Sequence, residues 1–361
     1  MNRLSLSLMA LAVVGAAQAS VTVNLQPMNS FGVNGWLAPV PVASDPASYL
    51  GTGSLERGLA YNPVSKNLIL VSRNGGAGNP IKILNGSTGA NLGNLNQGSG
   101  FVTGGTFPTN MVGVADDGAI FVGNLSTASA AFKVYRWNNE SSAPTVAFNA
   151  TTGMPRTGDT MDVIGSGLNT RLVASGSGSI GYNVMSTGDG VNFTGAYQNV
   201  GLVGEHRLGL TFIGQDEVWG RQTGVSGGRR STYSPSISNL GLLTLTSAGE
   251  APMDYAMVGG IGLLATIDAN SSVVRVYSLE NPAAPTLRAS LTNTTGTLSA
   301  NTNITGQVKF GEIVGNTATL YAMSTNQGIQ AFKVEAVPEP GTMIALGAGL
   351  AGLVARRRRR A

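Results

Sequence analysis

Short apolar runs separated by polar turns recur along most of the chain. Between Ser20 and about Val334 these runs are rich in β-branched and aromatic residues, and Gly, Asn, Asp and Ser occupy the gaps between them. No stretch longer than about a dozen residues keeps the 3.6-residue period of an amphipathic helix. We therefore predict an all-β body.

The apolar runs repeat in units of about 50 residues, each with an apolar strand, a turn, a second apolar strand, a polar loop and a third strand. The second strands begin 52, 52, 46, 45 and 57 residues apart. They cover residues 67–73, 119–125, 171–177, 217–223, 262–268 and 319–325. The third strands are clearest at 133–137, 274–278 and 330–334. Six such units predict a six-bladed β-propeller. A β-solenoid or a pair of sandwiches is the alternative, and the unit length counts against a solenoid.

The sixth unit ends after its third strand, at Val334. The segment that precedes the first unit, residues 21–42, contains the strand-like sequence VTVNL and an apolar stretch around Trp36. We expect this segment to supply the missing outer strand and to close the ring. Closure removes open sheet edges, which matters in a chain without disulfides.

The first 19 residues have the pattern of a secretory signal peptide. Arg3 precedes an apolar stretch over residues 4–17, and Ala17-Gln18-Ala19 supplies small residues at a cleavage site. We expect signal peptidase to release a chain that begins at Ser20. The alternative is a buried first helix.

The C-terminus combines three features. Val337-Pro338-Glu339-Pro340-Gly341 precedes a charge-free run over residues 342–355. A helix of that run is about 21 Å long and needs snorkelling side chains to span a hydrocarbon core of about 30 Å. Five consecutive arginines follow and predict a cytoplasmic end for the helix. They are Arg356, Arg357, Arg358, Arg359 and Arg360.

These three features together resemble the PEP-CTERM sorting signal. The resemblance covers about 25 residues and implies recognition of Pro338-Glu339-Pro340 by an exosortase, a membrane cysteine protease and transpeptidase of Gram-negative bacteria that make exopolysaccharide. It also implies a transient anchor in the inner membrane, followed by delivery to the cell surface or the medium. The alternative is an ordinary C-terminal anchor helix that no enzyme processes. The expected organisation is a signal peptide over 1–19, a body over 20–335 and a sorting tail over 336–361.

Composition removes several classes of function. The chain has no Cys, which excludes disulfides, thiolate metal sites and a Cys nucleophile. Its formal charge of +4 comes from Arg3 and the five terminal arginines, because the remaining 16 basic and 18 acidic residues carry a net charge of −2. A nucleic-acid partner for the body therefore lacks electrostatic support.

Candidate chemistry in the body is sparse. His206 is the only His, which excludes a multi-His metal site, and no Gly-x-Ser-x-Gly motif in a strand-to-helix context supports a Ser-His-Asp triad. Residues near the starts of the innermost strands should crowd one mouth of a propeller channel, and several of these residues are acidic. Their carboxylates could hold a cation such as calcium, in an arrangement that resembles six-bladed lactonase-like enzymes in outline. The expected positions are Glu56, Asn110, Asp162, Glu205, Asp254 and Asn303. The alternative is a set of unrelated solvated acids, and we expect no cofactor.

Two units also share a polar start to the innermost strand, Glu56-Arg57 in the first and His206-Arg207 in the fourth. Nothing in the body requires catalysis. We therefore expect a non-catalytic surface or matrix protein that contacts exopolysaccharide or surface proteins. A secreted metal-dependent hydrolase or lactonase is the alternative, and a periplasmic assembly factor is a weaker one.

Overall fold

The computed structural model describes residues 21–40, 49–73, 80–127, 130–222 and 228–338. Within it, Val23–Ala336 form one compact unit. The predicted signal peptide, with Ala17 and Ala19, lies outside the described residues. So do Glu339, Pro340, the apolar run 342–355 and the five arginines that follow it. In the described part of the chain, no helix is long and apolar enough to cross a membrane.

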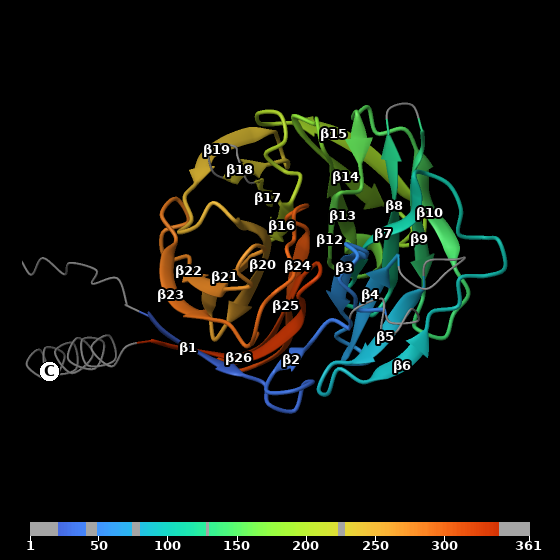
Figure 1. The fold of residues 1–361 in the computed structure, drawn as a ribbon. Coiled ribbons are helices and arrows are strands. Elements are labelled where there is room, and N and C mark those ends of the chain that lie inside the picture. The colour runs from blue at the N-terminus through green and yellow to red at the C-terminus, as the bar shows by residue number, and fades with distance from the viewer. Residues whose placement is uncertain (1–20, 41–48, 74–79, 128–129, 223–227, 339–361) are drawn as a thin grey trace, which may run out of the picture. The chain divides into compact units, whose positions relative to one another are not determined.

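The body is all-β and forms six antiparallel sheets, numbered here sheet 1 to sheet 6 (Figure 1). Sheet 1 contains β3 (Glu56–Tyr61), β4 (Asn67–Ser72), β5 (Ile81–Asn85) and β6 (Asn91–Asn94). Sheet 2 contains β7 (Phe107–Val114), β8 (Ile120–Thr127), β9 (Phe132–Trp137), β10 (Thr145–Ala150) and the short β11 (Arg156–Thr157). Sheet 3 contains β12 (Thr160–Ile164), β13 (Arg171–Ser175), β14 (Gly181–Thr187) and β15 (Phe193–Asn199).

The second half of the chain continues the same pattern. Sheet 4 contains β16 (Gly209–Ile213), β17 (Glu217–Arg221), β18 (Gly228–Thr232) and β19 (Ser238–Leu243). Sheet 5 contains β20 (Glu250–Val258), β21 (Ile261–Asp268), β22 (Val274–Ser278) and β23 (Thr286–Leu291). Sheet 6 contains β24 (Gly306–Val314), β25 (Thr317–Ser324), β26 (Gly328–Pro338), β1 (Val21–Pro27) and β2 (Trp36–Leu37). The predicted six-bladed propeller is confirmed.

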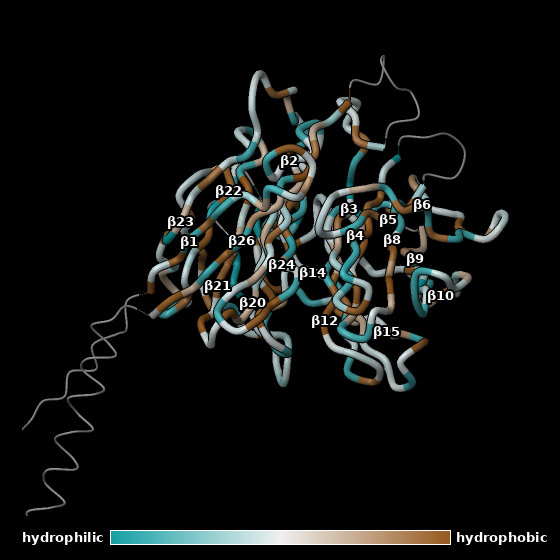
Figure 2. Tube along the Cα trace, turned by 90° about the horizontal axis from the view of Figure 1, so that it is seen from below, coloured by the Kyte–Doolittle hydropathy of each residue, from teal (hydrophilic) through white to brown (hydrophobic). Residues whose placement is uncertain are grey.

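The innermost strands of the six sheets contact one another in a circle, in the order β3, β7, β12, β16, β20, β24 and back to β3. Figure 1 shows them around the centre, with β6, β10, β15, β19 and β23 at the periphery. The outermost strands are mostly exposed, whereas the strands inside them are buried. In Figure 2 hydrophobic residues accordingly colour the strands and hydrophilic residues colour many of the connecting loops.

The apolar core lies between neighbouring sheets. Between sheets 2 and 3, Phe121 and Phe193 meet edge to face with ring centroids 5.4 Å apart. Such contacts stabilise beyond the apolar area they bury. Trp137 is fully buried between sheets 1 and 2, and its indole N–H donates to the carbonyl of Asn96 over 2.6 Å. Packing therefore couples each sheet to the next and fixes the positions of the innermost strands.

The predicted second strands coincide with β4, β8, β13, β17, β21 and β25 to within about two residues at either end. One predicted third strand, residues 274–278, has the bounds of β22. The signal was strong because these strands are buried on both faces and are therefore almost continuously apolar.

In sheet 6, β1 lies next to β26, so the strand order is β1, β26, β25 and β24, and β2 also pairs with β26. The Trp36 indole N–H donates to the carbonyl of Gln327 over 2.9 Å. This pairing is what a closing N-terminal strand requires, and the closure of the ring by that strand stays a prediction.

Candidate functional site

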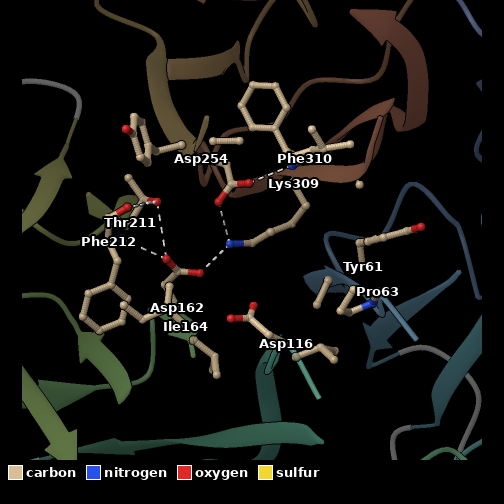
Figure 3. A pocket seen from close by; sticks show the side chains of 18 of the residues that line it. Tyr61, Pro63, Asp116, Asp162, Ile164, Thr211, Phe212, Asp254, Lys309 and Phe310 are labelled. Atoms are coloured by element: carbon tan, nitrogen blue, oxygen red, sulfur yellow. Dashed lines mark hydrogen bonds and ion pairs between the residues drawn. The ribbon is translucent and has the colours of Figure 1, made fainter. Parts of the chain in front are cut away.

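A cavity of about 430 Å³ opens at one mouth of the central channel. All six innermost strands, or the turns that follow them, contribute to its wall, each through residues from its middle or its C-terminal half. Figure 3 shows that the polar centre of this cavity is made by Asp162, Asp254 and Lys309. We call these three residues the acid–lysine cluster.

The acid–lysine cluster joins three sheets. Lys309 Nζ lies 2.5 Å from Asp162 Oδ1 and 2.9 Å from Asp254 Oδ1. The second oxygen of each carboxylate accepts a backbone N–H from the neighbouring innermost strand. Asp162 Oδ2 accepts from Phe212 over 3.0 Å, and Asp254 Oδ2 accepts from Phe310 over 2.7 Å. All four carboxylate oxygens therefore have partners in the protein.

Lys309 spans the channel. Sheets 3 and 6 are opposite each other in the ring, with two sheets between them on either side. The Lys309 side chain starts on β24 and meets Asp162 on β12, so it crosses the channel axis. The three residues are almost completely buried, with exposed fractions of 9% for Lys309, 4% for Asp162 and 8% for Asp254. The cluster consequently forms the floor of the cavity.

Burial and ion pairing oppose each other in this cluster. Burial raises the pKa of Asp254 to about 6, although the neighbouring Lys309 acts to lower it. Burial alone would lower the pKa of Lys309, but the Asp162 and Asp254 carboxylates raise it above its ordinary value. The ammonium group is therefore charged at neutral pH, as a buried ion pair requires.

The rim of the cavity combines aromatic and charged side chains. Phe212 and Phe310 lie beside the cluster, and Tyr61 lies on the opposite wall (Figure 3). Lys66 and Glu312 form a surface ion pair of 2.6 Å at the edge. Phe212, Phe310 and Tyr61 are themselves buried, whereas Tyr255 lines the same cavity and is partly exposed. A cavity with a polar floor and an accessible aromatic ring suits a ligand that has both hydroxyl groups and apolar faces.

Within the cluster itself, an ammonium group stands between the two carboxylates, where a bound cation would otherwise lie. Asp116 and Glu312 also line the cavity. Even so, the described ranges contain no group of three or more Asp, Glu or His side chains placed to hold a metal ion.

The six residues that were predicted to line one acidic mouth do not lie together in the structure. Asp162 and Asp254 lie within β12 and β20 and reach the cavity described above. Asn110 and Asn303 line the opposite mouth. The expectation of a single acidic mouth was wrong, because residues taken as strand starts occupy different levels along the channel. In β20 the pairing register is irregular between Glu250 and Met253, which made the start of this strand hard to predict.

Glu56 and Glu205 have partners of their own. Glu56 is the first residue of β3 and accepts the Gly51 N–H over 2.6 Å, and burial raises its pKa. Glu205 precedes β16 and receives two hydrogen bonds from Arg229, of 2.9 and 2.8 Å. Burial acts to raise the pKa of Glu205, but these bonds and the Leu202 N–H lower it. Both carboxylates thus serve local structure.

His206 is fully buried against the Tyr182 ring, with the ring centroids 5.1 Å apart. Neither ring nitrogen has a hydrogen-bond partner among the described residues. Burial lowers the pKa of His206 to about 4, so the imidazole is neutral at pH 7. Within the described residues, the imidazole therefore contributes packing against Tyr182 and makes no side-chain hydrogen bond.

Sequence analysis identified neither Lys309 nor the group of four arginines at the opposite mouth as site residues. Lys309 carried a usable signal, because it is the one charged residue in the buried start of β24, which reads GQVKF. The shared polar starts Glu56-Arg57 and His206-Arg207 likewise pointed to the opposite mouth. The sequence did not show that Arg57 and Arg207 lie close together, whereas in the structure both line one cavity.

Residues 336–360 match the family model described as the PEP-CTERM protein-sorting motif. The chain carries a PEP-CTERM sorting motif. The motif begins inside β26, whose last residue, Pro338, is the first proline of Pro338-Glu339-Pro340. No linker of its own therefore separates the PEP-CTERM motif from the last strand of the body.

Solved structures share the fold of the body. A DUF4623 family protein from Bacteroides eggerthii is 17% identical, with a TM-score of 0.64 over 89% of this chain and 76% of that chain. A gluconolactonase from Xanthomonas campestris is 11% identical, with a TM-score of 0.49 over 88% of this chain and 98% of that chain. No curated protein matches the chain. At these identities the likeness concerns the fold alone.

Proposed function

We propose that the chain is an exported protein, sorted by an exosortase, whose propeller is a non-catalytic binding module for exopolysaccharide or a surface protein. The PEP-CTERM motif supports export and sorting. In this proposal signal peptidase removes residues 1–19, residues 20–335 form the binding module, and residues 336–361 form the temporary membrane anchor. The mature module then acts at the cell surface or in the extracellular matrix.

The cavity above the acid–lysine cluster is the observation that supports binding. Its volume of about 430 Å³ is within the range of small-molecule sites. The charged groups on its floor, Asp162, Asp254 and Lys309, already pair with one another. A ligand that contacts them therefore does not need to carry a compensating charge. The partly exposed Tyr255 ring on its wall offers a flat apolar surface, which suits the face of a sugar ring.

The same cluster argues for binding over hydrolysis. A metal-dependent hydrolase or lactonase needs carboxylates that are free to hold a cation, and Lys309 binds Asp162 and Asp254 together. Neither carboxylate is consequently available as a metal ligand while Lys309 stays in place. The alternative activity therefore has no support from this geometry.

Sorting is tested by locating the protein in cells. The full chain and a chain that lacks residues 342–361 are expressed, and membrane, surface and culture medium are separated. We expect the full chain at the surface or in the medium, after a membrane-anchored form that appears in the membrane fraction. The shortened chain should not appear in the membrane fraction as such an anchored form. Identical distributions of the two chains would contradict the sorting proposal.

Binding is tested with a glycan array probed by the full chain in detergent. We expect retention on polysaccharide and a loss of at least tenfold in affinity for Tyr255→Ala, because this ring lines the cavity. Tyr197→Ala on the outermost strand β15 is the matched control and should bind as the wild type does. Equal binding by both variants would place the ligand elsewhere.

A further inference from the structure

Four arginines gather at the other mouth of the channel, at the end where the innermost strands begin. They surround a cavity of about 90 Å³, several times the space that one water molecule needs. Three separate stretches of the chain supply them. The arginines are Arg57, Arg73, Arg156 and Arg207, and Asp159, Asn110, Asn303 and Thr305 also line the cavity.

Backbone structure holds these side chains in place. Arg57 is the second residue of β3, and Arg73 directly follows β4, the strand that pairs with β3. Arg156 begins the short strand β11, which pairs with the end of β8. Arg207 lies two residues before β16. Because neighbouring innermost strands pack together, the fold brings the four guanidinium groups to one opening.

Among the described residues, one carboxylate lines this cavity, and it already has hydrogen-bond partners. Asp159 Oδ1 accepts from Arg156 Nη2 over 2.7 Å and from Arg156 Nε over 3.1 Å. Its second oxygen accepts the Ser177 N–H over 2.8 Å. Both oxygens of Asp159 therefore already have donors, and none of these bonds comes from the other three arginines.

The remaining arginines are short of acceptors. Arg73 stacks over the Phe107 ring at 3.4 Å and donates to the Asn110 side chain. Its Nε, together with Arg57 Nη1 and Arg207 Nε, is buried and lacks a hydrogen-bond partner among the described residues. A buried donor without an acceptor is costly, and the cost falls when a ligand supplies the acceptor.

The charge at this mouth is also unbalanced. Counting Glu56, which lies next to Arg57, there are two carboxylates for four guanidinium groups. Burial lowers the pKa of Arg73 to about 9, and the charges of Arg57 and Arg156 add to the effect. Burial likewise lowers the pKa of Arg57. The positive charge is concentrated here although the body as a whole is close to neutral.

We propose that this arginine mouth binds an oxyanion, the carboxylate or phosphate group of a small ligand. Guanidinium groups present paired N–H donors whose geometry matches the oxygens of both groups. The small cavity admits one such group and leaves the rest of the ligand outside. This site is separate from the cavity above the acid–lysine cluster and does not rest on the proposed function.

The first experiment measures thermal unfolding of the full chain in detergent with three probes. Inorganic phosphate and D-glucuronate carry the two candidate groups, and D-glucose is the neutral counterpart of glucuronate. We expect phosphate, glucuronate or both to raise the Tm, because a ligand that binds the folded state stabilises it. The rise from phosphate alone would identify a phosphate site, and the rise from glucuronate alone a carboxylate site. No rise beyond that given by sodium chloride at equal ionic strength, or an equal rise with glucose, would overturn the proposal.

Variants then locate the site. Arg57→Gln and Arg207→Gln should each weaken binding of the active probe about tenfold or more, since each removes charge-assisted hydrogen bonds. Arg288→Gln is the matched control, because Arg288 pairs with Glu280 on the outside of sheet 5. Unchanged affinity in both mouth variants would overturn the proposal.

A measurement on the wild type covers the case in which a variant does not fold. Phenylglyoxal modifies arginine side chains, and peptide mass spectrometry reports the modification at each position. The active probe should slow modification of Arg57 and Arg207 several-fold and leave that of Arg288 unchanged. Equal rates with and without the probe at all three positions would contradict a site at this mouth.

Discussion

The ammonium group of Lys309 and the carboxylate of Asp162 lie 2.5 Å apart across the central channel, although 147 residues separate them in the chain. The contact joins sheet 6 to sheet 3, which face each other in the ring. Asp254 completes the cluster from sheet 5. Contacts between opposite sheets are possible only at the channel, so this cluster adds a link that packing between neighbouring sheets does not provide.

Replacing Lys309 should therefore destabilise the whole body. In Lys309→Met the carboxylates of Asp162 and Asp254 stay buried without their cation, and breaking a buried ion pair in this way costs about 3–5 kcal/mol. We expect a corresponding fall in the free energy of unfolding, measured by urea denaturation of the full chain in detergent. Lys66→Met is the matched control, because Lys66 pairs with Glu312 at the exposed rim and should cost no more than about 1 kcal/mol. Equal stability of the two variants would show that the cluster is unimportant for folding.

Calcium should not stabilise the wild type, because the Lys309 ammonium group already occupies the position between the two best-placed carboxylates. We expect the same Tm with calcium, with magnesium and with a chelator. A ligand that binds the folded state raises stability with its concentration, so a rise specific to calcium would reveal a site. If that rise vanished in Asp162→Asn, the metal-dependent alternative would stand.

The fold was predictable because its signal is periodic and local. Strands such as β4, β21 and β25 are buried on both faces, so each has the sequence of an apolar run between turns. The spacing of those runs gave six units. Bounds of the innermost strands were harder to place, because irregular pairing in β20 and β24 shifts the register.

The candidate site was predictable only in part. Asp162 and Asp254 were expected near the channel, and the structure places both on innermost strands, where they line the cavity. Lys309 was missed because its partners lie 55 and 147 residues away, and no local pattern connects them. Ring geometry decides which residues face each other across a channel, and that geometry depends on the packing of all six sheets.

Gly220 should tolerate no side chain. A Cβ atom at this position of β17 would lie 2.2 Å from Cδ2 of the buried His206 ring. Gly220→Ala should therefore lower the free energy of unfolding by about 1–3 kcal/mol, the usual cost of overpacking a core. Gly188→Ala is the control, because nothing lies within 4 Å of the Cβ it would add. Equal Tm values for the two variants would contradict the tight packing around His206.

Two buried groups should give the stability of the body opposite dependences on pH. The pKa of His206 is lowered to about 4, so the unfolded chain binds the proton more tightly than the folded chain, and stability falls as the pH drops below about 6.5. The pKa of Asp254 is raised to about 6, so the folded chain binds the proton more tightly and stability rises as the pH drops through 6. In the wild type the two effects oppose each other between pH 7 and 5.

Single variants should separate the two effects. Asp254→Asn removes the Asp254 effect and keeps that of His206, which amounts to about 2 kcal/mol between pH 7 and pH 5, so the free energy of unfolding should fall over this interval. His206→Gln removes the His206 effect and keeps that of Asp254, to which the raised pKa of Glu56 adds in the same direction, so stability should instead rise over the same interval. Urea denaturation at pH 7, 6 and 5 measures both slopes, and this interval lies above the range in which exposed carboxylates titrate. Because His206 is the only His in the chain, no other imidazole can contribute. Slopes of the same sign in the two variants would show that one of these groups is more accessible to water in solution than the structure places it.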